Sequence, residues 1–167
     1  MKLIMSDRHI DTQISESEDL KYINLASMKI ANCVGCFGCW TKTPGKCFIR
    51  DDASKIYPYI AKSDSVVYIS KIKYGSYDTI MKTMIERAIP IQQAFIRIHN
   101  SETHHVQRNV LPKDATIIAY GSTDPEEQEI FRTIVSRNAL NMNFKSYKII
   151  FVSETEIEKT VQKILGI

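Results

Sequence analysis

The stretch ATIIAYGSTDPEEQEI, residues 115–130, contains one complete strand–turn–helix unit. Its first six residues are apolar, aromatic or β-branched and end at Gly121, which predicts a buried strand followed by a tight turn. Asp124, Pro125 and Glu127 then occupy the positions of a helix N-cap, a first helical residue and a capping-box acid. This order of signals predicts a strand that leads directly into a helix.

Similar units recur along the chain. Apolar runs predict further strands at residues 2–5, 20–25, 65–70 and 148–152. Helical patterns start at Asp52, at Ser76 (to Ile89, with Met81 and Met84 in its apolar stripe) and at Ser153. Strands that alternate with helices predict a parallel sheet with right-handed crossovers. We therefore expect a three-layer α/β fold, with five parallel strands in the order 2-1-3-4-5.

The link between the first two predicted strands is unusual. It is the 14-residue segment SDRHIDTQISESED, Ser6–Asp19, which is polar and poor in helix-forming residues. Since a parallel crossover normally needs a dozen or more residues, mostly helical, we expect this one to be short or irregular.

Length and composition indicate a globular protein and argue against nucleic-acid-binding, membrane-spanning and secreted proteins. With 167 residues, 44% of them hydrophobic and 25% charged, the chain is expected to form a single domain, 1–167. A net charge of +3 without a dense basic run argues against nucleic-acid binding. No apolar run reaches the ~18 residues of a membrane helix, and residues 1–11 lack the features of a secretory signal. We expect a cytoplasmic protein with reduced thiols.

All four cysteines of the chain lie in one loop-forming segment, residues 33–47. Cys33, Cys36, Cys39 and Cys47 follow the pattern C-x2-C-x2-C-x7-C, with three glycines and a proline between them. Thiolates spaced by two residues on such a loop can converge on one metal centre, and ferredoxins begin with the same spacing. An iron–sulfur cluster and four unligated thiols are the two leading interpretations, and zinc or a disulfide remains open.

Several motifs in sequence order carry a family resemblance. They are residues 30–52 (IANCVGCFGCWTKTPGKCFIRDD), 73–90 (KYGSYDTIMKTMIERAIP), 102–108 (ETHHVQR) and 136–140 (SRNAL). Together they resemble the flavodoxin-like NAD(P)H-dependent FMN reductases, and most of all the iron–sulfur flavoproteins. The resemblance implies a flavodoxin-like fold, bound FMN, NAD(P)H as co-substrate and a homodimer or larger homo-oligomer.

The resemblance also assigns site residues. Cys33, Cys36, Cys39 and Cys47 match the positions that hold a four-iron cluster in the iron–sulfur members. The loop 70–77 falls on the loop that passes the flavin ring: Ser70, Tyr74 and Gly75 match it, whereas Lys71 and Lys73 depart from it. A second ring-side loop follows Tyr120. The resemblance therefore implies the ring-side residues Ser70, Tyr74, Gly75, Ser76, Gly121 and Ser122. The phosphate loop of the family departs most, since no glycine precedes Gly35. Only Ser6, Arg8 and nearby hydroxyls remain to hold a phosphate, so we expect either weak FMN binding or a phosphate held by these residues.

These features favour an NAD(P)H-dependent flavin oxidoreductase, or an iron–sulfur flavoprotein that carries electrons between small-molecule donors and acceptors. The alternative is a degenerate relative without tight FMN that acts as a binding or structural partner. No catalytic residue is assigned. We expect His104 and His105 to be satisfied within a loop or interface, and Trp40 to be a core or interface anchor. Arg87 and Glu86 are expected to form a structural ion pair or a dimer contact.

Overall fold

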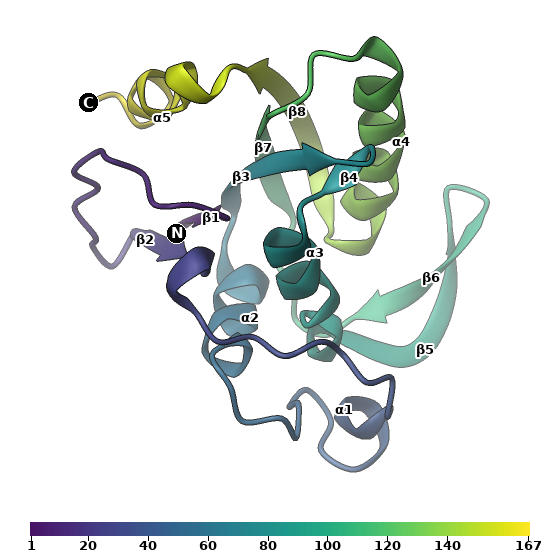
Figure 1. The fold of residues 1–167 in the computed structure, drawn as a ribbon. Coiled ribbons are helices and arrows are strands. Elements are labelled where there is room, and N and C mark those ends of the chain that lie inside the picture. The colour runs from purple at the N-terminus through teal and green to yellow at the C-terminus, as the bar shows by residue number, and fades with distance from the viewer.

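A parallel sheet forms the centre of the molecule, and the computed structural model describes it together with all other residues, 1–167 (Figure 1). Its strands are β1 (Lys2–Ser6), β2 (Leu20–Asn24), β3 (Ser65–Lys73), β7 (Lys113–Tyr120) and β8 (Phe144–Val152). They lie in the order β2-β1-β3-β7-β8, and each neighbouring pair is parallel. This is the predicted order 2-1-3-4-5, so the expected fold class is confirmed.

The helices begin close to the predicted signals, except α1 (Gly38–Thr41), which forms within the segment 33–47 that was predicted to be loop. The others are α2 (Ala53–Lys62), α3 (Thr79–Glu86), α4 (Pro125–Asn141) and α5 (Ile157–Leu165), with short 3-10 turns at Leu25–Ser27, Ile89–Ile91 and Glu154–Glu156. Asp124 caps α4 by accepting a hydrogen bond from the Glu126 N–H, and Ser153 and Glu156 form the capping box before α5. No helix combines the length and apolar composition of a membrane span.

Two helix-start predictions need correction. The helix predicted from Ser76 begins only at Thr79, because Ser76–Tyr77 form β4, which folds back antiparallel onto β3. Gly75 makes this reversal possible with a φ of +67°, and a Cβ there would lie 2.6 Å from Ile130. Asp52 precedes α2 but makes no capping bond, since its carboxylate accepts from the Lys29 N–H instead.

The two faces of the sheet are covered unequally. One face buries 23 hydrophobic residues under α2, α3 and α4, including Met81 and Met84, as predicted. The other face buries eight, and α5 supplies two of them, Ile157 and Val161. The Ser6–Asp19 link contains no helix, as expected, and it contributes the buried Ile10 to this thinner layer.

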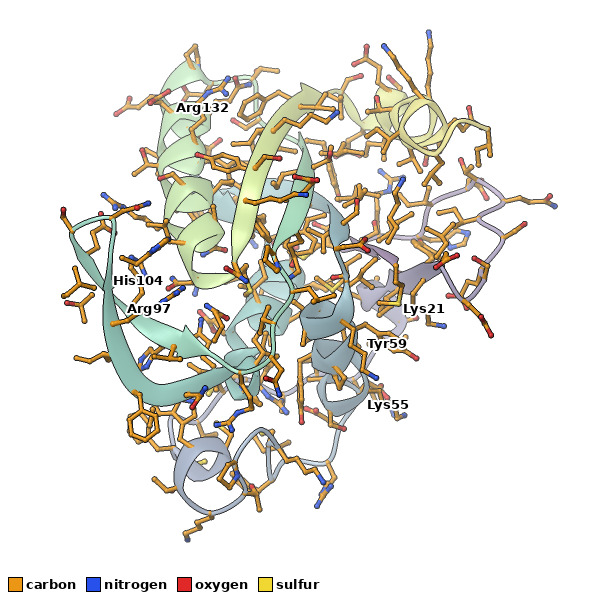
Figure 2. The ribbon with its side chains drawn as sticks, turned by 180° about the vertical axis from the view of Figure 1, so that it is seen from behind. Lys21, Lys55, Tyr59, Arg97, His104 and Arg132 are labelled. Atoms are coloured by element: carbon orange, nitrogen blue, oxygen red, sulfur yellow. The ribbon has the colours of Figure 1, made fainter.

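A two-stranded hairpin that the sequence reading missed projects from the body (Figure 1). It consists of β5 (Gln92–His99) and β6 (Glu102–Gln107), seen from behind in Figure 2. The end of α4 anchors it: the Asn141 carbonyl accepts from the amides of Gln92 and Gln107. His104 lies between the Asn141 and Glu102 side chains, each 3.1 Å away. Two of the motifs that carry the family resemblance, 102–108 and 136–140, thus lie against each other.

Candidate functional site

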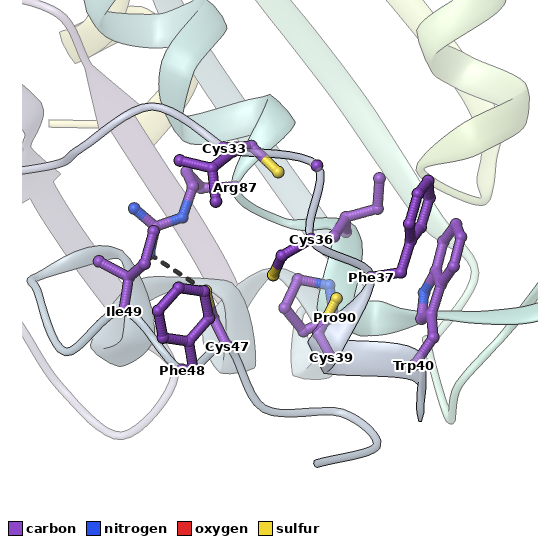
Figure 3. A pocket seen from close by; sticks show the side chains of 13 residues that line it. Cys33, Cys36, Phe37, Cys39, Trp40, Cys47, Phe48, Ile49, Arg87 and Pro90 are labelled. Atoms are coloured by element: carbon purple, nitrogen blue, oxygen red, sulfur yellow. Dashed lines mark hydrogen bonds between the residues drawn. The ribbon is translucent and has the colours of Figure 1, made fainter. Parts of the chain in front are cut away.

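The four cysteines line one pocket, although they differ in exposure (Figure 3). Cys39 is buried, Cys47 is half-buried, and Cys33 and Cys36 are exposed; all four are free thiols. Most of the other lining side chains are hydrophobic, and they include Val34, Phe37, Trp40, Phe48, Ile49 and Pro90. The four thiols thus border one pocket with an apolar wall, and their convergence on a metal centre stays a prediction.

Two glycines with positive φ angles and the contacts of Trp40 determine the course of the cysteine loop. The chain turns at Gly35 (φ +63°) and Gly45 (φ +82°), a conformation that glycine adopts without steric cost. Trp40 donates from Nε1 to the Gln92 carbonyl at 3.1 Å, and its ring lies 4.5 Å from that of His105. Trp40 therefore anchors the loop to the β5–β6 hairpin.

Two donors already point at thiol sulfurs. The Gly38 N–H donates to Cys36 Sγ, and Arg87 Nη2 donates to Cys47 Sγ, both at 3.5 Å. Burial raises the pKa of the Cys39 thiol, and the nearby thiols of Cys47, Cys33 and Cys36 raise it further. Negative charge on several of these sulfurs is therefore costly unless cations balance it.

The donor set fits an iron–sulfur cluster better than a single ion. In this conformation, no group of three or more His, Cys, Asp or Glu side chains is placed to hold one metal ion. A four-iron cluster makes a different demand, because each of its four cysteine sulfurs binds a different iron and they need not converge on one point. Four thiols around one apolar pocket, with N–H donors directed at two sulfurs, supply the ligands and the surroundings of such a cluster.

Arg87 lines this pocket and is 1% exposed. Its guanidinium donates to the Ala31 carbonyl at 2.6 Å and to both carboxylate oxygens of Asp51, at 2.6 and 2.9 Å. The predicted structural ion pair exists, but the prediction of Glu86 as its partner was wrong. Glu86 binds Lys82 on the exposed face of α3, because neighbouring helical residues point in different directions.

At the carboxyl ends of the strands, a carboxylate occupies the edge where the phosphate was expected. Asp7 accepts from Ser70 Oγ at 3.1 Å, from the Lys71 N–H at 2.6 Å and from the Tyr120 hydroxyl at 2.8 Å. Burial raises the pKa of Asp7, against the effect of these bonds, and burial followed by the Asp7 charge raises the pKa of Tyr120. Asp7 was missed as a structural centre because its partners are 63 to 113 residues away.

The predicted phosphate residues are engaged elsewhere. Ser6 is fully buried, and its hydroxyl accepts from the Arg8 N–H. The Arg8 guanidinium lies 3.7 Å from Glu154, which also approaches Lys71 Nζ at 3.6 Å. Because no helix begins after β1 and a carboxylate fills the edge, the residues present do not fit an FMN phosphate here.

The predicted ring-side residues lie at the same edge but border two separate open hollows. Tyr74 and Ser76 line one of them, with Asn32 and Lys82. Gly121 and Ser122 line the other, with Glu154. The Tyr74 side chain is 87% exposed, and the Gly75 N–H donates to Glu127 at 3.2 Å. In this chain alone the two loops do not enclose a common cavity.

Comparison with known sequences finds relatives that match about half of the chain. No protein-family model matches the chain. An iron–sulfur flavoprotein of Archaeoglobus fulgidus is 30% identical over 89 residues, which are 51% of this chain and 40% of that protein. One from Methanocaldococcus jannaschii is 29% identical over 80 residues, 48% of this chain and 40% of that protein. The resemblance to the iron–sulfur flavoproteins is confirmed. The matched segments span about two fifths of these relatives.

Solved structures confirm the flavodoxin-like fold. An FMN-dependent NADH-azoreductase from Bacillus anthracis, solved with FMN, has a TM-score of 0.59 at 12% identity and covers 98% of this chain and 94% of its own. An NAD(P)H:quinone oxidoreductase from Methanothermobacter marburgensis has a TM-score of 0.61 at 10% identity, covering 99% and 95%. At these identities the likeness concerns the fold, and not the site.

Proposed function

We propose that this protein is an electron-transfer protein of the iron–sulfur flavoprotein type, with its redox centre in the loop 33–47. The observation that carries the proposal is the pocket that all four thiols line. A four-iron cluster, when bound there, supplies one-electron oxidation and reduction. The chain would contribute Cys33, Cys36, Cys39 and Cys47 as ligands, and Phe37 and Phe48 would limit the access of water.

The names of the iron–sulfur flavoprotein relatives also support a flavin as a second redox group. NAD(P)H as the electron donor and a small molecule as the acceptor are part of this proposal and follow from the family resemblance of the sequence motifs. Tyr74, Gly75, Ser76, Gly121 and Ser122 remain the proposed ring-side residues. Ser70, also predicted there, is fully buried and its hydroxyl is bonded to Asp7, so it is no longer proposed. FMN binding by this chain is proposed to be weak, because the Asp7 carboxylate lies at the end of β1, where the FMN phosphate was expected. Electron transfer through the cysteine loop does not depend on that phosphate site.

Anaerobic reconstitution with ferrous iron and sulfide tests the redox centre. We expect about four irons and four sulfides per chain, and a broad visible absorption that bleaches with dithionite. Replacing Cys39 or Cys47 with serine should remove most of the bound iron. Lys46→Gln, an exposed neighbour in the same loop, should leave it unchanged. Binding of one zinc ion per chain, or of no metal, would contradict the proposal.

A second candidate is a protein without redox cofactors that acts as a binding partner. The carboxylate of Asp7 at the edge where a phosphate was expected favours it. The same reconstitution separates the two candidates, because a cofactor-free partner would stay colourless and would tolerate all four cysteine substitutions.

A further inference from the structure

One buried guanidinium connects both ends of the cysteine loop. Arg87 donates to the Ala31 carbonyl, two residues before Cys33, and to Asp51, four residues after Cys47. From the same group, Nη2 donates to Cys47 Sγ at 3.5 Å (Figure 3, dashed line). Arg87 itself ends α3, so the loop is attached through it to the body of the fold.

The bonds within the protein leave part of this side chain unused. Arg87 is 99% buried, and its Nε is one of the few buried polar atoms without a hydrogen-bond partner. A buried donor without a partner destabilises a fold, so such groups call for an explanation. Because Arg87 lines the pocket of the four thiols, an anionic group in that pocket is the ligand that a buried cation with a free donor favours.

We propose that Arg87 positions Cys47 and sets the reduction potential of the cysteine centre, an inference that rests on the proposed function. A cluster held by four thiolates is anionic, and it gains one more negative charge on reduction. A fixed cation beside it therefore stabilises the reduced form more than the oxidised form. Hydrogen bonds to the sulfurs act in the same direction, because they stabilise negative charge on sulfur.

Replacing Asp51 should shift the reduction potential in the opposite direction to replacing Arg87. Its carboxylate pairs with Arg87 and therefore offsets part of the positive charge that reaches the pocket. Removing the charge of Arg87 should make the cluster harder to reduce. Removing the charge of Asp51 should make it easier to reduce. A residue that only held the loop in shape would not produce opposite shifts.

The experiment is a redox titration of the reconstituted full chain, followed by electron paramagnetic resonance. Dithionite is the reductant, and each reduced cluster takes up one electron. At the midpoint potential of the unchanged protein, Arg87→Gln should lower the ratio of reduced to oxidised cluster at least tenfold, which is 59 mV for a one-electron couple. Asp51→Asn should raise that ratio. Arg87→Lys, which keeps the charge, should restore most of the loss.

Arg50→Gln is the matched control, because it removes the same charge from an exposed side chain three residues from Cys47. A midpoint in Arg87→Gln equal to that of Arg50→Gln would overturn the inference and leave the proposed function intact. If Arg87→Gln does not fold, Asp51→Asn decides the question, and an unchanged or lowered ratio in it overturns the inference. An unchanged protein that binds no cluster would refute both.

Discussion

At the scale of single residues, Asp7 decides which anion lies at the carboxyl ends of the parallel strands. Parallel strands direct backbone N–H groups and side chains from separate strands to one edge, and this edge favours an anion. In this protein the anion belongs to the chain, since three donors from β3 and β7 surround the Asp7 carboxylate. The same three donors are consequently unavailable to a ligand.

Asp7→Asn should stabilise the fold at neutral pH. Since the native state raises the pKa of Asp7 through burial, it binds the proton more tightly than the unfolded chain. The contribution of Asp7 to the free energy of unfolding is therefore most favourable below pH 4, and it is lost as the pH rises through the raised pKa. Asparagine resembles the protonated acid, so we expect a higher free energy of unfolding than in the unchanged protein at pH 7, and a difference that disappears at low pH. Urea unfolding across this pH range measures it.

Asp7→Ala is the matched comparison. It leaves the Lys71 N–H and the Tyr120 hydroxyl without an acceptor, and each such loss costs about 1–3 kcal/mol, whereas the Ser70 hydroxyl keeps its bond to the Lys71 carbonyl. This variant should therefore be less stable than the unchanged protein at every pH. Equal stability of the alanine and asparagine variants would show that Asp7 makes no important bonds.

At the scale of elements, the link between β1 and β2 predicts weak FMN binding. Because no helix follows β1, its N-terminal N–H groups and dipole are missing from the edge. Losing two or three charge-assisted bonds of ~1.5–3 kcal/mol each weakens binding by several orders of magnitude. We expect micromolar or weaker affinity in a flavin-fluorescence titration. Asp7→Asn should tighten it, whereas Asp11→Asn, an exposed acid in the same link, should not. Nanomolar affinity would contradict this account.

The β5–β6 hairpin is the element that the sequence alone failed to predict. Its strands do not show a simple alternation of buried and exposed residues, since the register shifts between Gln92 and Ile96. Its anchors are polar: Gln92, His104 and Gln107 all bond to Asn141 at the end of α4. Such contacts between distant segments leave no periodic signal along the chain.

At the scale of the whole molecule, we propose that the hairpin mediates self-association. Phe95, Ile96 and Ile98 are 72%, 65% and 75% exposed. An exposed apolar group of this kind is typical of a protein–protein interface. Light scattering at micromolar concentration should give a mass above the 19.2 kDa of one chain. Ile98→Glu should shift it to the monomer, because a buried carboxylate at the interface is unfavourable.

Ile167→Glu is the control for this experiment. Ile167 is 66% exposed and lies at the C-terminus, away from the hairpin, so the same change there should leave the mass unaltered. A single 19 kDa species in the unchanged protein would refute the proposed self-association.

The sequence by itself determined the order of the five parallel strands and of α2, α3, α4 and α5, the capped start of α4, the irregular link after β1 and the grouping of the four cysteines in one segment. These features follow from residues close together along the chain, where hydrophobic period, caps and motif spacing act. Only the tertiary structure decided that Arg87 pairs with Asp51 and reaches Cys47, that Asp7 fills the sheet edge, and that a hairpin lies against α4. Those contacts join segments tens of residues apart. A buried polar group must find a hydrogen-bond partner, but the local sequence does not show which distant residue will be that partner.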